Sequence, residues 1–310
     1  MKRFLLILMR YGCYLLLVLA AWLMLPDRYS RSSHEANVRL ASERIKVAES
    51  PKIVLIGGSG CQFGFVSELL EEHFHRPVIN TGAHACLGLQ LQVNLFRDAF
   101  RPGDLVVLIP EYDQYSVPVL FSGCLDESML RIMLSNYPKG LTKLTRDQWY
   151  SSLPFVPRYM AKTLLHFTAT ADPWSPYSVK SINQYGDETN WENRPAWYKD
   201  NPHIEHIIDT PYEEALFFLR ELKDECQKDS VTLLLFPPAL AQSEYEYNTA
   251  YIEKLQTVLA ENSTLFCALP DRYCLPDSLY FDSYYHMTYE GAYKRTKMVI
   301  EDIEKNLKQE

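Results

Sequence analysis

The sequence predicts an α/β domain in which a parallel sheet is covered by helices on both faces. Apolar runs recur at residues 53–56, 78–79, 105–109, 231–236 and 264–268. Amphipathic helical segments separate these runs, as expected for parallel strands joined by helical crossovers. The first run, "IVLI", is bounded by glycine and suits a strand that is buried on both faces. Together these observations predict a three-layer α/β fold.

Local signals mark the start of three helices in the second half of the chain. Residues 210–213, "TPYE", form a capping-box pattern with proline at the first helical position. A second capping pattern begins at residue 243 and has a glutamate three residues later. A third helix is expected from about residue 288 towards residue 307. These helices fit between and after the last two expected strands.

The α/β domain is expected to consist of residues 52–112 and 210–310. Residues 28–51 are polar and predict a spacer or stalk helix. Residues 113–209 contain few periodic segments and predict an insertion or cap after the third strand. Tryptophan, tyrosine, asparagine and proline cluster in this insertion. They suit either a cap that stacks on sugars or simple packing of the insertion onto the sheet.

The first 27 residues predict a membrane anchor. Lys2, Arg3 and Arg10 accompany an apolar segment at residues 4–25, which are 22 residues. As a helix this segment is about 33 Å long, enough to cross a hydrocarbon core of ~30 Å. The basic residues place the N-terminus in the cytoplasm and the body of the protein outside it. The absence of a small-x-small cleavage site favours an uncleaved signal anchor over a cleaved signal peptide.

Charge and motif content exclude several classes of function. The net charge of -8 and the absence of a long basic run argue against binding to nucleic acid. No Cys-x-x-Cys or His-Glu-x-x-His spacing predicts a metal site. The glycines after the first strand lack the lysine of a P-loop and the spacing of a dinucleotide fingerprint. No metal and no cofactor are therefore expected.

Ser59 lies in a run of small residues, "GGSGCQFG", directly after the first expected strand. The turn after such a strand faces the ligand site of an open parallel sheet. The nucleophile pattern Gly-x-Ser-x-Gly is missed by one residue, because Cys61 holds its last position. By local pattern alone, the segment is a nucleophile turn, a phosphate loop or a tight corner.

Asp282 and His286 lie in "FDSYYH", shortly before the last expected helix. An acid near a histidine can hold one ring nitrogen and leave the other free to take a proton from serine. Strand ends on one edge of a parallel sheet converge, so this pair is expected close to Ser59. His84 is a second candidate base, although a histidine held by its own tight loop is the favoured interpretation.

The three motifs "GGSG", "INTG" and "FDSYYH", in that order, resemble the SGNH (GDSL-like) hydrolase superfamily. The resemblance covers roughly residues 50–112 and 230–305 and is strongest to a membrane-anchored bacterial branch. It implies a flavodoxin-like fold with a Ser59 nucleophile and a His286 base oriented by Asp282. It also implies oxyanion or substrate contacts, which are expected at Gly60, Asn80, Gly82 and Glu111.

The resemblance further implies an activity and a location. Many members of the superfamily remove or transfer acyl groups on envelope polysaccharides. The expected function is therefore a membrane-anchored serine esterase or O-acyltransferase that acts on acyl esters of cell-envelope glycans. A membrane acyltransferase is a candidate partner, and the domain after the anchor is expected outside the cytoplasm.

Three departures from the family pattern leave an alternative open. Gly58 replaces the usual aspartate before the serine, and Glu111 stands where an asparagine usually supplies an oxyanion donor. Three residues rather than two separate Asp282 from His286. An ionised Glu111 would repel a developing oxyanion. The alternative is an inactive accessory protein of the same fold that binds a glycan or a partner in an envelope assembly complex.

Overall fold

Four parallel strands form the central sheet of the protein. The computed structural model describes residues 1–123, 126–165, 167–202, 211–262 and 266–308. The sheet has the order β2–β1–β3–β4, and its strands are β1 (Ile53–Gly57), β2 (Val78–Asn80), β3 (Leu105–Ile109) and β4 (Thr232–Leu235). All neighbouring pairs are parallel, so the strands end at the same edge. The expected mixed α/β class with a parallel sheet is confirmed.

The fifth expected strand, at residues 264–268, is not found in the part that can be described. Residues 264 and 265 lie outside the described residues, and residues 266–268 form no strand. Cys267 nevertheless donates its N–H to the carbonyl of Leu235, at the end of β4, over 2.7 Å. A second, small parallel pair is formed by β5 (Leu240–Ala241) and β6 (Cys274–Leu275).

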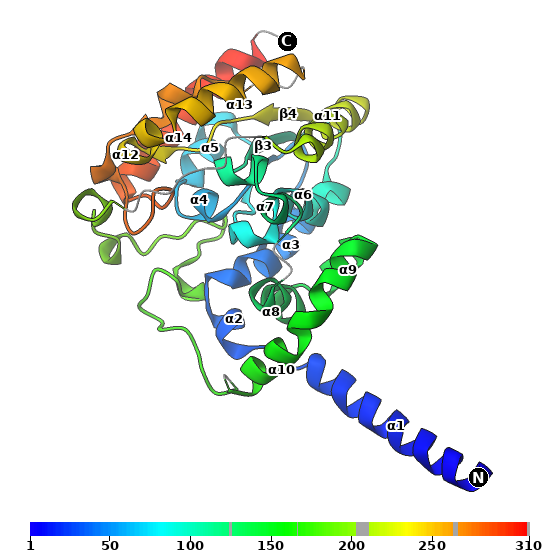
Figure 1. The fold of residues 1–310 in the computed structure, drawn as a ribbon. Helices are drawn as coiled ribbons and strands as arrows, with labels where there is room; N and C mark the ends of the chain where they lie inside the picture. Colours follow the sequence, from blue (N-terminus) through cyan, green and yellow to red (C-terminus); the bar gives the residue numbers. More distant parts are fainter. Residues whose placement is uncertain (124–125, 166, 203–210, 263–265, 309–310) are drawn as a thin grey trace.

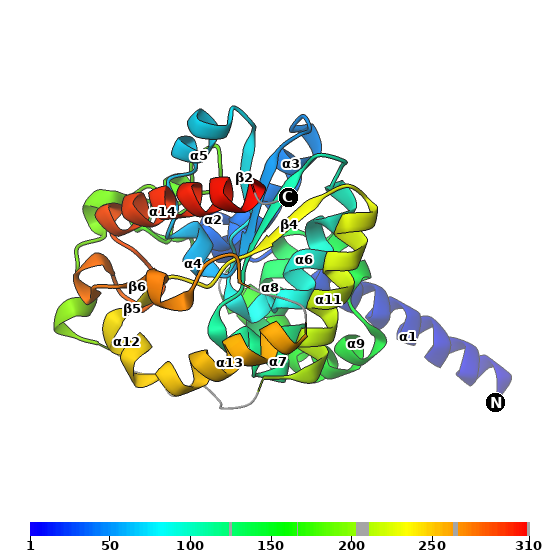
Figure 2. The same ribbon diagram turned by 90° about the horizontal axis from the view of Figure 1, so that it is seen from above.

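Helices lie on both sides of the central sheet (Figures 1 and 2). The α-helices in chain order are α1 (Lys2–Leu23), α2 (Arg28–Ser32), α3 (Asn37–Val47), α4 (Ser59–Gln62), α5 (Ser67–Phe74), α6 (Leu89–Phe96), α7 (Pro118–Ser122), α8 (Glu127–Asn136), α9 (Arg146–Ser152), α10 (Val156–Leu165), α11 (Glu213–Lys228), α12 (Gln242–Tyr247), α13 (Thr249–Glu261) and α14 (Tyr289–Leu307).

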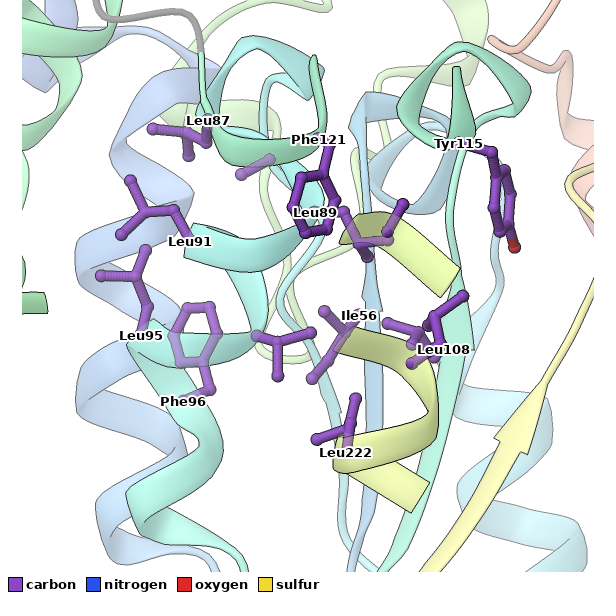
Figure 3. Close-up of a cluster of buried hydrophobic side chains, with 14 of the residues drawn as sticks. Ile56, Leu87, Leu89, Leu91, Leu95, Phe96, Leu108, Tyr115, Phe121 and Leu222 are labelled. Carbon is purple, nitrogen blue, oxygen red and sulfur yellow. The ribbon is translucent and has the colours of Figure 1, made fainter. Parts of the chain in front are cut away.

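Alternation along the strands divides the core into two apolar clusters. Successive strand side chains point to opposite faces of a sheet. On one face, Ile53 and Leu55 pack with α5 and α14. On the other face, Ile56 and Leu108 pack with residues of α3, α6 and α11, such as Leu222 (Figure 3). Because every residue of β1 and β3 is buried, these strands read as continuous apolar runs in the sequence.

One of the three expected helix starts agrees with the structure. Thr288 caps α14, since its Oγ1 accepts the N–H of Gly291 over 3.3 Å. Helix α12 begins at Gln242 with Ala241 as its N-cap, so the expected cap at residue 243 lies inside the first turn and is wrong. The third start is wrong, because α11 begins at Glu213 and its N-cap is Tyr212, so the proline precedes the helix. The expected cap at residue 210 lies outside the described residues.

The segment expected as a spacer, residues 28–51, is instead part of the folded domain. Val38, Ala41 and Ile45 of α3 are buried in one of the two core clusters. Asn37, at the start of α3, donates its side-chain amide to the carbonyl of Gly82 over 2.8 Å. The sequence did not indicate that α3 packs on the domain, because only one face of this helix is buried and its overall composition is polar.

The insertion after β3 has a helical half and an irregular half. Helices α7 to α10 lie between residues 118 and 165, and residues 167–202 contain only short 3₁₀ turns among the described residues (green in Figure 1). Tyr185 and Tyr198 of the irregular half are buried, so they pack the insertion onto the domain. Trp174 is 78% exposed. Packing onto the sheet domain is therefore shown for Tyr185 and Tyr198, whereas a contact of Trp174 with sugar stays a prediction.

Helix α1 projects away from the body of the protein (Figure 1). Its 22 residues are exposed except for the last two, Trp22 and Leu23. Among the described residues, this is the one helix long and apolar enough to cross a membrane.

Candidate active site

Ser59, His286 and Asp282 form a chain of hydrogen bonds at the carboxyl edge of the sheet. Ser59 is the first residue of α4, two residues after β1 ends. Its Oγ lies 2.9 Å from Nε2 of His286, and Nδ1 of His286 lies 2.9 Å from Oδ1 of Asp282. The structure thus brings together the three residues that the sequence proposed as nucleophile, base and acid.

The longer spacing between Asp282 and His286 does not prevent this geometry. The backbone folds back on itself between the two residues, because the N–H of His286 donates to the carbonyl of Ser283 over 3.3 Å. The N–H of Phe281 donates to the carbonyl of His286 over 2.8 Å and closes the loop. One of the three departures from the family pattern is therefore accommodated by a local turn.

Tyr177, from the irregular half of the insertion, supports the acid. Its hydroxyl donates to Oδ2 of Asp282 over 2.5 Å and lies 3.1 Å from Nδ1 of His286. Burial and the nearby carboxylate raise the pKa of Tyr177, so the phenol stays protonated. Burial acts to raise the pKa of Asp282, but the hydrogen bonds from His286 and Tyr177 outweigh it and hold this pKa below its ordinary value. Asp282 is therefore ionised at neutral pH.

Phe63 and Arg194 fix the plane of the His286 ring. The ring of Phe63 stacks on His286 with 4.4 Å between centroids and 18° between planes. Arg194 donates to the carbonyl of Phe63 over 2.9 Å and also to the carbonyl of Met287. The charge of this buried arginine is paired with Glu188 over 2.6 Å. Residues of the insertion thus lock both the acid and the base in place.

His34 packs against the rings of Tyr177 and Phe63. Its ring meets Tyr177 edge-on at 4.9 Å and Phe63 edge-on at 5.8 Å between centroids. Burial, together with the neighbouring His84 and His286, lowers the pKa of His34 to about 3. His34 is therefore neutral and adds no charge beside His286.

Asn80 and Gly82, which were expected to contact an oxyanion or substrate, make hydrogen bonds within the protein. The N–H of Gly82 donates to Oδ1 of Asn80 over 2.9 Å. The amide of the buried Asn80 side chain donates to the carbonyl of Cys61 over 2.9 Å and to Asp187 over 2.8 Å. Asn80 therefore ties β2 to α4 and to the insertion, and the Gly82 N–H already has an acceptor.

Glu111 lies beside the turn that carries Ser59. It follows β3, and its Oε1 accepts the N–H of Gly60 over 3.3 Å. A Cβ placed on Gly58 would lie 2.0 Å from the same oxygen. Burial raises the pKa of Glu111 to about 7, although the Gly60 N–H acts in the opposite direction. The two remaining departures from the family pattern, at 58 and 111, are thus in direct contact.

The N-terminus of the helix after Gly64 is occupied by a carboxylate of the protein itself. This helix, α5, begins at Ser67, whose N–H donates to Oδ2 of Asp187 over 2.7 Å. A carboxylate of the insertion therefore caps its N-terminus. Among the described residues, none accepts a hydrogen bond from the Ser59 N–H, which remains the backbone donor next to the nucleophile.

His84 is held by its own loop. Its Nδ1 accepts the N–H of Cys86 over 3.2 Å, which caps the short 3₁₀ turn at Ala85–Leu87. This bond supports the structural interpretation of His84 over the role of a second base.

The sequence did not single out Tyr177, Phe63, His34 or Arg194. The only signal for Tyr177 was the cluster of aromatic residues in the insertion. Among the described residues, no group of three or more histidine, cysteine or acidic side chains is placed to hold a metal ion. The chain matches no protein-family model, and no curated protein gives a significant match. The resemblance to the SGNH superfamily therefore stays a prediction, and the function must be argued from the site.

Proposed function

We propose that the protein is a serine-dependent acyl-transfer enzyme, an esterase or O-acyltransferase with the flavodoxin-like fold of SGNH hydrolases. The observation that carries this proposal is the hydrogen-bonded chain from Ser59 through His286 to Asp282. A base within hydrogen-bond reach of a hydroxyl, itself oriented by an ionised acid, is the arrangement that activates serine as a nucleophile.

The first half of the reaction forms an acyl-enzyme. Oγ of Ser59 attacks the carbonyl carbon of an ester while Nε2 of His286 takes the hydroxyl proton. The carbonyl electron pair moves to the oxygen and forms the oxyanion. When this pair returns, the bond to the alcohol breaks, and the leaving oxygen takes the proton from Nε2. Asp282, kept ionised by Tyr177, stabilises the imidazolium between these two proton transfers.

The second half transfers the acyl group to an acceptor hydroxyl. His286 takes the proton of the acceptor as its oxygen attacks the acyl carbon, and Ser59 regains a proton when the intermediate collapses. Water as acceptor gives a carboxylic acid and makes the enzyme an esterase. A sugar hydroxyl gives a new ester and makes it an O-acyltransferase.

The substrate class that we propose is an acylated glycan of the cell envelope. Trp174, which is 78% exposed, lies three residues before Tyr177 in the irregular half of the insertion. Its carbonyl accepts the side-chain amides of Asn190 over 2.7 Å and Asn193 over 3.1 Å, which hold this part of the chain in place. An exposed indole three residues from the tyrosine that supports Asp282 offers a flat apolar surface against which a sugar ring can pack.

We further propose that α1 anchors the domain in a membrane, with the domain outside the cytoplasm. The hydroxyl of Tyr159 in α10 donates to the carbonyl of Leu25, just after α1, over 3.0 Å. Farther along α10, Leu165 is 78% exposed, and the exposed ring of Phe167 lies 5.3 Å from the guanidinium of Arg28. Apolar side chains with an arginine at the exit of a spanning helix suit contact with the lipid surface.

The accessory-protein alternative has one observation in its favour. The N–H groups of Gly60 and Gly82, both expected near the oxyanion, already donate to Glu111 and Asn80. The Ser59 N–H remains as a donor, but loss of each further oxyanion donor typically costs ~100- to 1,000-fold in turnover, so a site with this donor alone would bind a substrate and react slowly or not at all.

Labelling with a fluorophosphonate separates the two functions. The full chain in detergent should react covalently at Ser59, and Ser59→Ala should not react. Ser122→Ala is the matched control, because that hydroxyl bonds within its own helix and should leave labelling unchanged. If the folded protein is not labelled, or if Ser59→Ala is labelled equally, the enzyme proposal is wrong and the accessory role replaces it.

A further inference from the structure

Gly58 and Glu111 form one coupled feature of the site. All three of the nearest atoms that a Cβ at Gly58 would meet belong to Glu111, at 2.0, 2.6 and 3.2 Å. Gly58 has φ of -70°, which any residue adopts, so its backbone does not require glycine. The glycine is required instead by the carboxyl group of Glu111. The two departures from the family pattern, Gly58 and Glu111, are therefore explained together, because glycine at 58 leaves room for the Glu111 carboxyl group.

The carboxyl group of Glu111 lies against the turn of the nucleophile. Its Oε1 contacts Gly58 on one side of Ser59 and accepts the N–H of Gly60 on the other side. It therefore occupies the region where an SGNH-type site is expected to hold the asparagine donor. The protonation state of Glu111 decides whether this group can help the reaction.

The charged and titratable groups around Glu111 are few. Arg295 of α14 is the cation nearby, but its Nη1 is committed to a backbone carbonyl of the nucleophile turn over 2.7 Å. Asp113, in the turn after β3, opposes a negative charge on Glu111. Tyr285, from the loop before α14, and Cys61 of α4 are both buried, and burial raises the pKa of each, so both are neutral. Burial and Asp113 thus favour the protonated form over the pull of Arg295.

The two forms of Glu111 have opposite effects on an oxyanion. An ionised carboxylate only accepts hydrogen bonds and repels a developing negative charge. A protonated carboxyl can accept the Gly60 N–H at one oxygen and donate an O–H from the other. A carboxylic acid kept neutral by an apolar site is a known means of supplying such a donor.

We propose that Glu111, in its protonated form, donates a hydrogen bond to the oxyanion of the reaction at Ser59, and that its ionisation turns the site off. This inference rests on the proposed function. It assigns to Glu111 the catalytic role that the missing asparagine leaves open. It also explains how the buried Glu111 can lie beside Ser59 without opposing the reaction.

The pH dependence follows from the sign of the shift. The raised pKa of Glu111, about 7, keeps the acid protonated below neutral pH and ionised above it. His286 must be neutral to accept the proton of Ser59. On the alkaline side the activity falls as Glu111 ionises. An ordinary serine hydrolase site has no such alkaline fall near neutrality.

The test compares fluorophosphonate labelling rates of the full chain, from about pH 5 to about pH 9, with those of Glu111→Gln and Glu111→Ala. Glutamine accepts the Gly60 N–H with its oxygen and donates with its amide at every pH. Its labelling rate should therefore stay on a plateau above pH 7, whereas the wild-type rate falls by ~10-fold or more. Alanine removes the donor and should be slower than glutamine at every pH, by ~100-fold.

The outcomes distinguish this proposal from the enzyme proposal. If the glutamine variant shows the same alkaline fall as the wild type, or if alanine matches glutamine, Glu111 is not the donor, while the labelling itself keeps the enzyme proposal intact. If no variant reacts at any pH and all remain folded by circular dichroism, both proposals are wrong.

Discussion

The contact between Gly58 and Glu111 predicts that alanine at position 58 has opposite effects in two backgrounds. In the wild type, the new Cβ would meet Oε1 of Glu111 at 2.0 Å, so the carboxyl group must move by more than an ångström and lose the Gly60 N–H. Overpacking of this kind costs about 1–3 kcal/mol. Gly58→Ala should therefore lower the free energy of unfolding by this amount.

In a Glu111→Ala background, the same substitution meets none of these atoms. The backbone of Gly58 suits alanine, and replacing glycine at such a position stabilises a protein by about 0.4–1 kcal/mol through the unfolded chain. The effect should thus change sign, with a coupling free energy of about 1.5–4 kcal/mol between the two sites.

Chemical denaturation of the four proteins of this cycle, in the same detergent at pH 6, measures the coupling. At this pH the neutral form of Glu111 prevails in the wild type. If Gly58→Ala changes the free energy of unfolding by the same amount in both backgrounds, within about 0.5 kcal/mol, the contact between Gly58 and Glu111 is refuted. The argument that glycine at 58 makes room for Glu111 is then wrong as well.

Three further predictions concern other parts of the molecule. Tyr177→Phe removes a hydrogen bond to the Asp282 carboxylate and should cost about 1.5–3 kcal/mol at pH 7. Because the pKa of Asp282 is lowered in the fold, this stabilisation exists above the ordinary pKa, so the deficit in denaturation should shrink as the pH falls through the folded pKa. Lys52→Met removes the cation that pairs with the buried Asp104 and should cost about 3–5 kcal/mol, which thermal melts should show as a large drop. A second change, Asp104→Asn, removes the unpaired charge, keeps an acceptor for the N–H of Lys52 or of Arg101, and should recover part of this loss. A photo-crosslinking residue in place of Leu165 should capture lipid from nanodiscs, while one on the exposed face of α11 should not; equal capture would contradict the membrane contact.

The sheet and the three central residues of the site could be predicted from the sequence. Buried parallel strands are continuous apolar runs, and β1 and β3 show this pattern clearly. The ends of parallel strands meet at one edge, so Ser59 and His286 were expected to be close although 227 residues separate them. That prediction rested on the order of strands in a parallel sheet and not on the local sequence around Ser59.

The supports of the site could not be predicted, because they come from segments without periodicity. Tyr177 lies in an irregular stretch, and only the folded path of the insertion brings it to Asp282. Asp187 likewise caps α5 across 120 residues. Gly58 and Glu111 each stood out in the sequence as a departure. Their compensation became apparent only when the distance between them was known.

The chain order of the site bears on when during synthesis the site can form. The serine emerges early in synthesis, but its base lies 227 residues later, close to the final helix, and the tyrosine that supports the acid lies between them. Such long-range closure is slow, because loop entropy must be overcome before the contacts form. In a chain that is incomplete, Ser59 therefore lacks its hydrogen-bond partner His286. If Ser59 is the nucleophile that we propose, it becomes reactive only after the end of the chain has been made and the loop before α14 has docked.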